Sequence, residues 1–295
     1  AQVTSVAQVV AARTCSAAPS PLSVEGFGHR GRMSSSQSSL WPMTKLAARR
    51  AALGQGSCAT GSAPPTKGLA VLLTTGAMNP AHRGHVQLLH QAKARLEQAG
   101  YMVLAAFLSP THDGYVQPKA RRLGAVGLSG ALRAELATRT IEPHDDLVEV
   151  SRWEVEQPCF VDFPEVSMEL QEVLGDEARV FYACGTDHAS RCGLERCGIG
   201  RSIGVVVVPR AGERVPREVD DLVLVAQPAE GEVAQFSSTK VRQAVAERNS
   251  EYLRRAMAAS AADLLLHPSA EEAREFEADL RKLGLLASPP RCDSL

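Results

Sequence analysis

Two histidines at the start of an amphipathic stretch are the residues of this sequence best suited to chemistry. His82 and His85 lie in the segment 76–85, which reads Gly-Ala-Met-Asn-Pro-Ala-His-Arg-Gly-His. An apolar run precedes this segment and apolar residues at helical spacing follow it, so the imidazoles fall where a helix N-terminus attracts anions. There they can donate hydrogen bonds to phosphate oxygens as negative charge develops. The alternative is a capped helix with two incidental surface histidines.

A second segment, far along the chain, also combines features that suit an anion. Residues 236–242 read Phe-Ser-Ser-Thr-Lys-Val-Arg and open another stretch with helical spacing. Hydroxyl side chains suit the N-cap of a helix, whereas Lys240 and Arg242 place positive charge in a first turn that already carries the positive end of the dipole. A bound polyphosphate would supply the compensating negative charge. The competing interpretation is an ordinary capped helix with basic surface residues.

The elements that would position these residues follow an alternation of strands and helices. The apolar pattern predicts strands around 68–75, 101–108, 147–150, 179–184, 203–208 and 222–225, and helices around 86–96, 128–138, 166–174, 239–247 and 271–283. Such an alternation is typical of an α/β fold with a doubly wound parallel sheet. Ligands of these sheets bind beyond the carboxyl ends of the strands. The expected site is therefore formed by the loops that follow Thr75, Leu108, Cys184 and Val208.

The composition divides the chain into three parts. Residues 1–66 are rich in Ala, Ser, Gly and Thr and contain one acid, Glu25, which predicts a disordered or transit-peptide-like extension without a core. Residues 67–266 hold the alternating pattern, and residues 267–295 form a C-terminal helix and tail. We expect an intracellular protein, in a plastid or mitochondrion if the extension is a transit peptide and otherwise in the cytoplasm or nucleus.

Charge and cysteine content exclude several classes of function. The 295 residues carry a formal net charge of -1, so no global basic field favours nucleic acid or a membrane surface as a partner. The apolar runs are strand-sized and fall short of the roughly 20 residues that cross a bilayer. The seven cysteines lack the paired spacing of a zinc site and the density of a disulfide scaffold, which indicates reduced thiols.

The two segments together carry a specific resemblance. Residues 76–85 are similar to the G-x-F-x-P-x-H-x-G-H signature of the nucleotidyltransferase superfamily, with Met78 in place of the usual Phe and Ala77 where Ser or Thr is common. Residues 236–242 resemble the I-S-S-T-x-x-R motif of the same superfamily, in the same order along the chain. Met78 is still apolar and Ala77 is still small, so we expect the function to be weakened rather than lost.

Further stretches resemble one branch of that superfamily, the eukaryotic mononucleotide adenylyltransferases of NAD synthesis. The resemblance spans roughly residues 68–266. It rests on Ser109 to Tyr115, Arg152 to Glu154, Cys184 to Asp187 and Pro209 to Gly212, which are similar to the family's S-P-x-x-D-x-Y, W-E, C-G-x-D and T-R-A-G stretches. The resemblance implies transfer of AMP from ATP to nicotinamide or nicotinate mononucleotide, with release of pyrophosphate.

The resemblance also implies roles for individual residues. The catalytic residues that the resemblance implies are His82, His85 and Arg242. Those that meet the nucleotide would be Gly76, Ala77, Met78, Lys119, Gly185, Asp187, Ser238, Thr239, Lys240 and Val241. Trp153 and Arg210 would bind the mononucleotide, Trp153 by stacking on the pyridine ring. A place in the core is the alternative for Trp153.

Magnesium is the expected cofactor, held mainly by the ATP phosphates and water because this ion dehydrates reluctantly. No protein metal ligand is expected. The expected partners are ATP and a mononucleotide, without nucleic acid or membrane, and the sequence leaves a homo-oligomer open.

Some departures from the family leave rival functions open. The family's second Trp, beyond the G-x-D loop, is missing from the segment 190–202, and Val116 to Pro118 replace the lysines expected after Tyr115, with Lys119 displaced. One rival is a sister transferase that uses phosphopantetheine as acceptor or CTP as donor. The other is a degenerate homologue that binds nucleotide and acts as a regulator.

Overall fold

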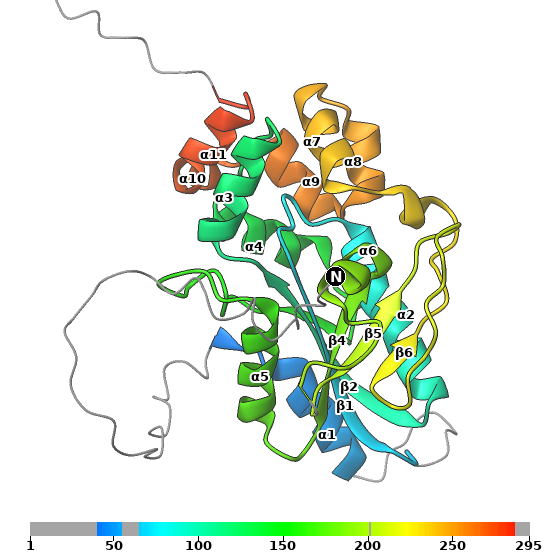
Figure 1. Ribbon diagram of the computed structural model, residues 1–295. Helices are drawn as coiled ribbons and strands as arrows, with labels where there is room; N and C mark the ends of the chain where they lie inside the picture. Colours follow the sequence, from blue (N-terminus) through cyan, green and yellow to red (C-terminus); the bar gives the residue numbers. More distant parts are fainter. Residues whose placement is uncertain (1–39, 55–64, 201, 287–295) are drawn as a thin grey trace, which may run out of the picture. The chain divides into compact units, whose positions relative to one another are not determined.

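Six parallel strands form the centre of the fold. The structure is a computed structural model that describes residues 40–54, 65–200 and 202–286, all within one compact unit, 34–295. The strands lie in the order β3-β2-β1-β4-β5-β6, and each neighbouring pair is parallel (Figure 1). They are β1 (Gly68–Gly76), β2 (Tyr101–Pro110), β3 (Val148–Val150), β4 (Arg179–Gly185), β5 (Gly204–Val208) and β6 (Val223–Val225). This doubly wound order, reversing between β1 and β4, confirms the predicted fold class.

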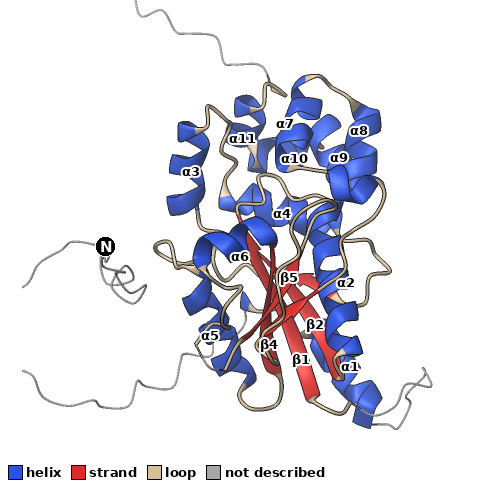
Figure 2. Ribbon diagram, turned by 45° about the vertical axis from the view of Figure 1, so that its right-hand side comes forward, coloured by secondary structure: helices blue, strands red, loops and turns tan. Residues whose placement is uncertain are grey.

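Helices cover both faces of this sheet, which explains the continuous apolar runs (Figure 2). In β1, Ala70 and Leu72 pack on one face with Leu89 of α2 (Arg83–Gln98), whereas Val71 and Leu73 pack on the other with α1 (Thr44–Gly54) and α5 (Phe163–Leu174). All four β1 side chains are fully buried. A strand that is buried on both faces shows no polar alternation, as the sequence pattern indicated.

Several helices were absent from the sequence-based prediction. The predicted helices correspond to α2, α4 (Gly130–Thr140), α5, α7 (Ser238–Ala246) and the pair α10 (Ala270–Glu275) and α11 (Glu277–Lys282). Those not predicted are α1, α3 (Asp113–Arg122), α6 (Thr186–Cys192), α8 (Ser250–Ala256), α9 (Ala259–Leu266) and the 3₁₀ turn η3 (Glu232–Gln235). Pro118 inside α3 and the shortness of α6 and α8 weakened the helical signal.

The assignment of residues 1–66 to a coreless extension is wrong for residues 40–54. Trp41 and Leu46 are 2 % and 3 % exposed and belong to the core on the α5 face of the sheet. The Lys45 ammonium donates to the carbonyl oxygens of Asp145 and Val148, and Arg49 donates to the carbonyl of Val103 at 3.0 Å. These contacts bind α1 to the β2–β3 side of the sheet. The rest of the predicted extension lies outside the described residues, except 65 and 66.

The division at residue 266 also differs from the structure. A third apolar cluster contains Leu132 and Leu136 of α4 together with side chains of α7, α8, α9 and α11. Phe276 and Leu280, beyond the predicted boundary, are 5 % and 0 % exposed in the same cluster. The C-terminal helices are therefore part of the same folded unit. Among the described helices, none combines the length and the apolar character that a membrane span requires.

Candidate active site

The two distant segments meet at one cavity beyond the carboxyl ends of β1, β4 and β5. The cavity has a volume of about 260 Å³ and is lined by His82, Gly84, His85, Leu88, Gln91, Gly185, Val208, Pro209, Arg210, Ala229, Val233, Ala234, Phe236, Ser237 and Ser238. Its wall thus combines the start of α2, the ends of β4 and β5, and the start of α7. The predicted meeting of the histidine segment with the hydroxyl segment is confirmed.

The two histidines form the N-terminal cap of α2. The His82 Nδ1 accepts a hydrogen bond from the Gly84 N–H at 3.2 Å, and the His85 Nδ1 accepts one from the His82 N–H at 3.1 Å. This is a capping box in which imidazoles replace the usual hydroxyl and carboxylate. Because each Nδ1 accepts a hydrogen bond, a neutral ring carries its proton on Nε2. Each histidine therefore keeps one N–H donor for a ligand.

Gly84 is required by the same geometry. A Cβ atom at this position would lie 2.9 Å from the His82 Nδ1, closer than real side chains allow. The glycine between the histidines thus lets the His82 ring fold over the first turn of the helix, with the ring centroids of His82 and His85 only 3.9 Å apart.

Burial keeps both imidazoles neutral near pH 7. Desolvation, helped by the charge of Arg210 and by the neighbouring ring, lowers the pKa of His82 to about 2. Desolvation likewise lowers the pKa of His85 to about 4, and the charge of Arg210 acts in the same direction. The cavity therefore presents neutral N–H donors when empty. An anionic ligand would raise both pKa values, because negative charge favours the protonated ring.

Hydrogen bonds fasten the start of α7 to the loop that precedes the histidines. The Ser238 hydroxyl donates to the Pro80 carbonyl at 2.8 Å, and the Arg242 guanidinium donates to the Asn79 carbonyl at 2.5 Å. The second terminal nitrogen of Arg242 reaches the Thr239 hydroxyl at 3.3 Å. The N-cap of α7 is Ser237, whose hydroxyl accepts from the Lys240 N–H. Two segments more than 150 residues apart are thus held as one surface.

Three cations around this surface have no carboxylate in ion-pair contact with their side chains among the described residues. Lys240 donates to the Gln235 carbonyl, and Arg242 donates to the Asn79 carbonyl and the Thr239 hydroxyl. The Arg210 side chain lines the cavity. Within the part of the chain that the structure describes, none of these three cations forms an ion pair. Unpaired cations beside a helix N-terminus create an anion-binding surface.

The candidate site residues divide into three groups by position. Those that line the cavity are His82, His85, Gly185, Arg210 and Ser238. Those that lie in the adjoining turns without lining it are Gly76, Ala77, Thr239, Lys240 and Arg242, as well as the exposed Asp187 at the start of α6. The side chains of Met78 and Val241 are 3 % and 0 % exposed and pack in the apolar clusters, so only their backbone can contact a nucleotide.

Trp153 and Lys119 lie away from the cavity. Trp153 is 7 % exposed, and Trp41 stacks on it with ring centroids 6.1 Å apart. The core alternative for Trp153 is therefore the one that the structure supports, because the indole offers little surface to a pyridine ring. Lys119 lies over the ring of Tyr115 at 5.1 Å, in a cation–π contact on α3.

Sequence reasoning missed several residues that shape the site. The N-cap Ser237 could have been found from the preference of N-caps for serine. Arg133 and Glu154, both at most 1 % exposed, carry no local signal of burial because charged residues are rarely buried.

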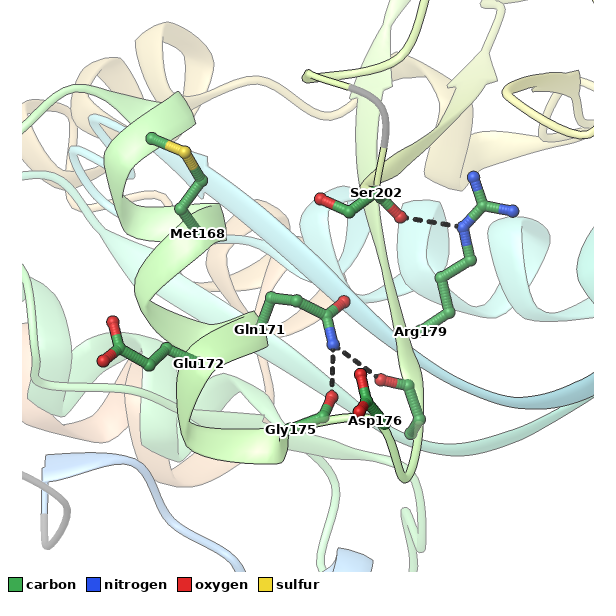
Figure 3. Close-up of a pocket in the computed structure, with 8 residues that line it drawn as sticks. Met168, Gln171, Glu172, Gly175, Asp176, Arg179 and Ser202 are labelled. Carbon is green, nitrogen blue, oxygen red and sulfur yellow. Dashed lines mark hydrogen bonds between the residues drawn. The ribbon is translucent and has the colours of Figure 1, made fainter.

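The volume of a cavity does not identify the site either. A larger cavity of about 630 Å³ lies at the amino end of β4, where Gln171 donates to the carbonyls of Gly175 and Ala178 (Figure 3).

The chain is similar to proteins that are already known. Residues 73–244 match the family model described as cytidylyltransferase-like. The chain is 27% identical over 200 residues to the nicotinamide/nicotinic acid mononucleotide adenylyltransferase of Oryza sativa subsp. japonica, covering 61% of this chain and 77% of that protein. It is 29% identical over 98 residues to nicotinamide/nicotinic acid mononucleotide adenylyltransferase 2 of Rattus norvegicus, covering 33% of this chain and 28% of the rat protein.

A solved structure, the Plasmodium falciparum nicotinic acid mononucleotide adenylyltransferase complexed with APC, superposes with a TM-score of 0.46 at 9% identity and covers 71% of this chain and 96% of its own. The family model spans more than half of the chain and includes both the histidine cap of α2 and the start of α7. The chain therefore belongs to the cytidylyltransferase-like family, within the nucleotidyltransferase superfamily that its two motifs predicted.

Proposed function

We propose that this chain transfers AMP from ATP to nicotinamide or nicotinate mononucleotide and releases pyrophosphate. The observation that carries the proposal is the cavity in which two neutral imidazole donors lie beside the hydroxyl-rich start of α7. Arg210, Lys240 and Arg242 lie nearby and form no ion pair with any described residue. Relatives with the name nicotinamide/nicotinic acid mononucleotide adenylyltransferase support the choice of substrate.

The chemistry requires alignment and charge neutralisation more than proton transfer. A phosphate oxygen of the mononucleotide attacks the α-phosphorus of ATP, a new P–O bond forms, and the bond from the α-phosphorus to the bridging oxygen breaks as pyrophosphate leaves. The attacking phosphate is already ionised near pH 7, so no general base is needed. The Nε2–H groups of His82 and His85 would donate to oxygens that gain charge in the transition state. Lys240 and Arg242 would neutralise the leaving pyrophosphate.

Magnesium would arrive bound to ATP. The described residues contain no group of three or more His, Cys, Asp or Glu side chains placed to hold a metal ion. The residues present fit an ion whose ligands are phosphate oxygens and water, and the one carboxylate among the predicted site residues is Asp187 at the start of α6. When bound, the ion would neutralise charge on the β- and γ-phosphates.

An aromatic surface remains accessible for the acceptor on the β2–β3 side. Tyr115 follows β2 and Phe160 follows β3, and their rings stack with centroids 5.1 Å apart. The two residues are 37 % and 38 % exposed. Because both lie beyond the carboxyl ends of their strands, as the nucleotide cavity does, they are placed to contact the base of a mononucleotide bound at the same edge of the sheet.

The experiment is a pyrophosphate-release assay with ATP, magnesium and one acceptor at a time. We expect release with nicotinamide or nicotinate mononucleotide and none with phosphopantetheine or with CTP as donor. Release only with phosphopantetheine, or only with CTP, would assign a sister activity. ATP binding without pyrophosphate release for every acceptor would replace the enzyme by a nucleotide-binding regulator.

A further inference from the structure

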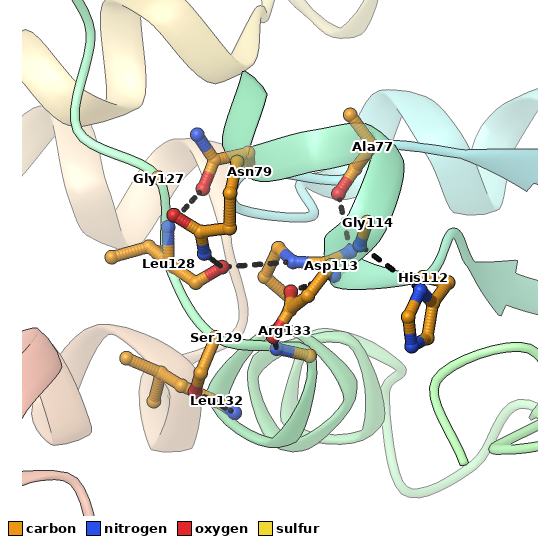
Figure 4. A network of polar contacts seen from close by, with 12 residues as sticks. Ala77, Asn79, His112, Asp113, Gly114, Gly127, Leu128, Ser129, Leu132 and Arg133 are labelled. Atoms are coloured by element: carbon orange, nitrogen blue, oxygen red, sulfur yellow. Dashed lines mark hydrogen bonds and ion pairs between the residues drawn. The ribbon is translucent and has the colours of Figure 1, made fainter. Parts of the chain in front are cut away.

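One fully buried cation contacts the loop that leads to the histidines. Arg133 of α4 is 0 % exposed. Its guanidinium donates to the Ala77 carbonyl at 2.8 Å, to the Leu128 carbonyl at 3.1 Å and to the Asp113 carboxylate at 2.8 Å (Figure 4). Arg133 thus joins the loop after β1, the approach to α4 and the start of α3.

A buried ion pair of this kind is an inefficient way to stabilise a fold. Removing a charge from water is costly, and an apolar side chain of similar volume is often equally or more stabilising. The Asp113 carboxylate is 39 % exposed, so only the arginine bears the full desolvation. The planar guanidinium of Arg133 holds its N–H donors in a fixed arrangement. Its hydrogen bonds are therefore better explained by the backbone carbonyls that they orient than by a gain in stability.

The oriented backbone is a strained one. Met78 has a φ of 42°, in the left-handed region that is unfavourable for a residue with a side chain. Its two neighbours are both held from the segment 126–133. Arg133 binds the Ala77 carbonyl, and the Asn79 amide donates to the Val126 carbonyl at 2.7 Å and accepts from the Leu128 N–H at 3.0 Å. Strain of this size persists only where surrounding contacts over-determine the conformation.

We propose that Arg133 is a positioning residue that holds the backbone of residues 77–79 in the conformation that places the histidine cap of α2 for phosphoryl transfer. It acts through the Ala77 carbonyl and does not touch the substrate. The inference deepens the proposed function and rests on it for its kinetic readout. Its structural readout, the protection of the loop, is independent of any activity.

The test replaces Arg133 by methionine, which is of similar length and carries no charge. We expect kcat for pyrophosphate release to fall by about 10- to 100-fold, because a displacement of about 1 Å at a site of this kind has an effect of that size. The KM for ATP should change by less than about threefold, since Arg133 makes no contact with the cavity. Hydrogen exchange of the amides of residues 76–85 should accelerate in the variant.

Arg139→Met is the matched control. Arg139 lies on the same helix and forms ion pairs with Glu135 and Glu272, but it has no contact with the loop. Its kcat and its loop exchange should equal those of the wild type. Arg133→Met leaves the Asp113 carboxylate without its partner. If this variant does not fold, the double variant Arg133→Met with Asp113→Asn removes that carboxylate, and its kcat and loop exchange are measured in the same way.

The outcomes separate this inference from the proposed function. Slower turnover with faster loop exchange in the Arg133 variants, and neither in Arg139→Met, supports the positioning role. Unchanged kcat, or a loss of stability with unchanged loop exchange, overturns it. If the wild type releases no pyrophosphate with any acceptor, the proposed function fails, and the exchange of residues 76–85 alone decides the role of Arg133.

Discussion

At the scale of single residues, the two site histidines each perform two tasks. One ring nitrogen of each caps α2, and the other is left to donate to a ligand. The cap orients the rings before any ligand binds, so no ordering of these side chains is required at the moment of reaction. The same arrangement makes an alanine substitution ambiguous, because it removes the cap and the donor together.

Glutamine at position 85 separates the two tasks. Gln is a usual capping-box residue at this position, so His85→Gln should keep the stability of the fold while it removes the imidazole donor. We expect turnover to fall by roughly 100- to 1000-fold, because the flexible Gln side chain does not hold its amide N–H as the capped imidazole holds its Nε2–H. His85→Ala should show the same loss of turnover and also lower the free energy of unfolding by about 1 kcal/mol.

Steady-state kinetics and urea unfolding measure both effects. His144→Ala, at an exposed histidine, is the control and should behave as the wild type. Full activity of His85→Gln would refute the role of the imidazole in the reaction.

Glu154 predicts a dependence of stability on pH. Burial raises the pKa of its carboxyl from the usual 4.5 to about 8, against the opposing effects of Ser109, Thr111 and Arg133. Between these two values the folded protein keeps a proton that the unfolded chain releases. The contribution of Glu154 to stability is therefore complete below about pH 4.5 and declines as the pH rises toward about 8, by up to about 1.4 kcal/mol per pH unit.

Glu154→Gln should remove this decline. The measurement is the free energy of unfolding in urea at about pH 5 and about pH 8, where the wild type should lose more stability than the variant over the interval. Glu156→Gln, at an exposed carboxylate two residues away, serves as the control. Parallel pH profiles for the wild type and Glu154→Gln would contradict a buried neutral carboxyl at this position.

At the scale of elements, the carboxyl ends of the strands form two neighbouring surfaces. The ends of β4 and β5 line the cavity with the histidines, and the segments after β2 and β3 carry the exposed Tyr115–Phe160 stack. An enzyme that joins two nucleotides needs two such surfaces side by side. The order of the strands, with β1 between β2 and β4, places them next to each other.

Phe160→Ala tests the second surface. We expect the KM for the mononucleotide to rise about threefold to tenfold, because an aromatic contact contributes about 0.5–1.5 kcal/mol. The KM for ATP should not change. Leu123→Ala, at a residue 70 % exposed at the end of α3, is the control and should leave both values unchanged. An equal rise of both KM values would show that Phe160 does not act on the acceptor alone.

At the scale of the whole molecule, the folded unit extends beyond the part that matches the family model. The model covers residues 73–244, whereas α1 packs before it and α8, α9 and α11 pack after it. Trp41 lies between Phe107 and Trp153, with ring centroids 5.5 Å and 6.1 Å away. Trp41, just before α1, therefore completes the apolar cluster on the face of the sheet that α5 covers.

Trp41→Ala should destabilise the whole unit. The loss of a fully buried aromatic side chain lowers the free energy of unfolding by about 3–5 kcal/mol. Leu53→Ala on the following helix α1, at a residue 37 % exposed, should change it by less than about 0.5 kcal/mol. Urea unfolding measures both. If Trp41→Ala proved as stable as the wild type, residues 40–54 would not belong to the cooperative core.

The amino-acid sequence by itself determined the fold class and the two anion-binding segments. Strands buried on both faces give uninterrupted apolar runs such as 68–75, and a helix start carries its capping residues within one turn, as at 82–85 and 236–242. These signals are local, so they are legible without a structure. The parallel sheet then implied that both segments lie at the same edge.

Only the tertiary structure decided which side chains face the cavity and which are buried. Trp153 was open between a pyridine contact and the core until Trp41, more than 100 residues earlier, was found stacked on it. Arg133 is distant from Ala77 in sequence, and nothing local indicates that its guanidinium donates to the Ala77 carbonyl. Burial and long-range pairing depend on contacts between segments far apart in the chain, and a linear pattern does not encode those contacts residue by residue.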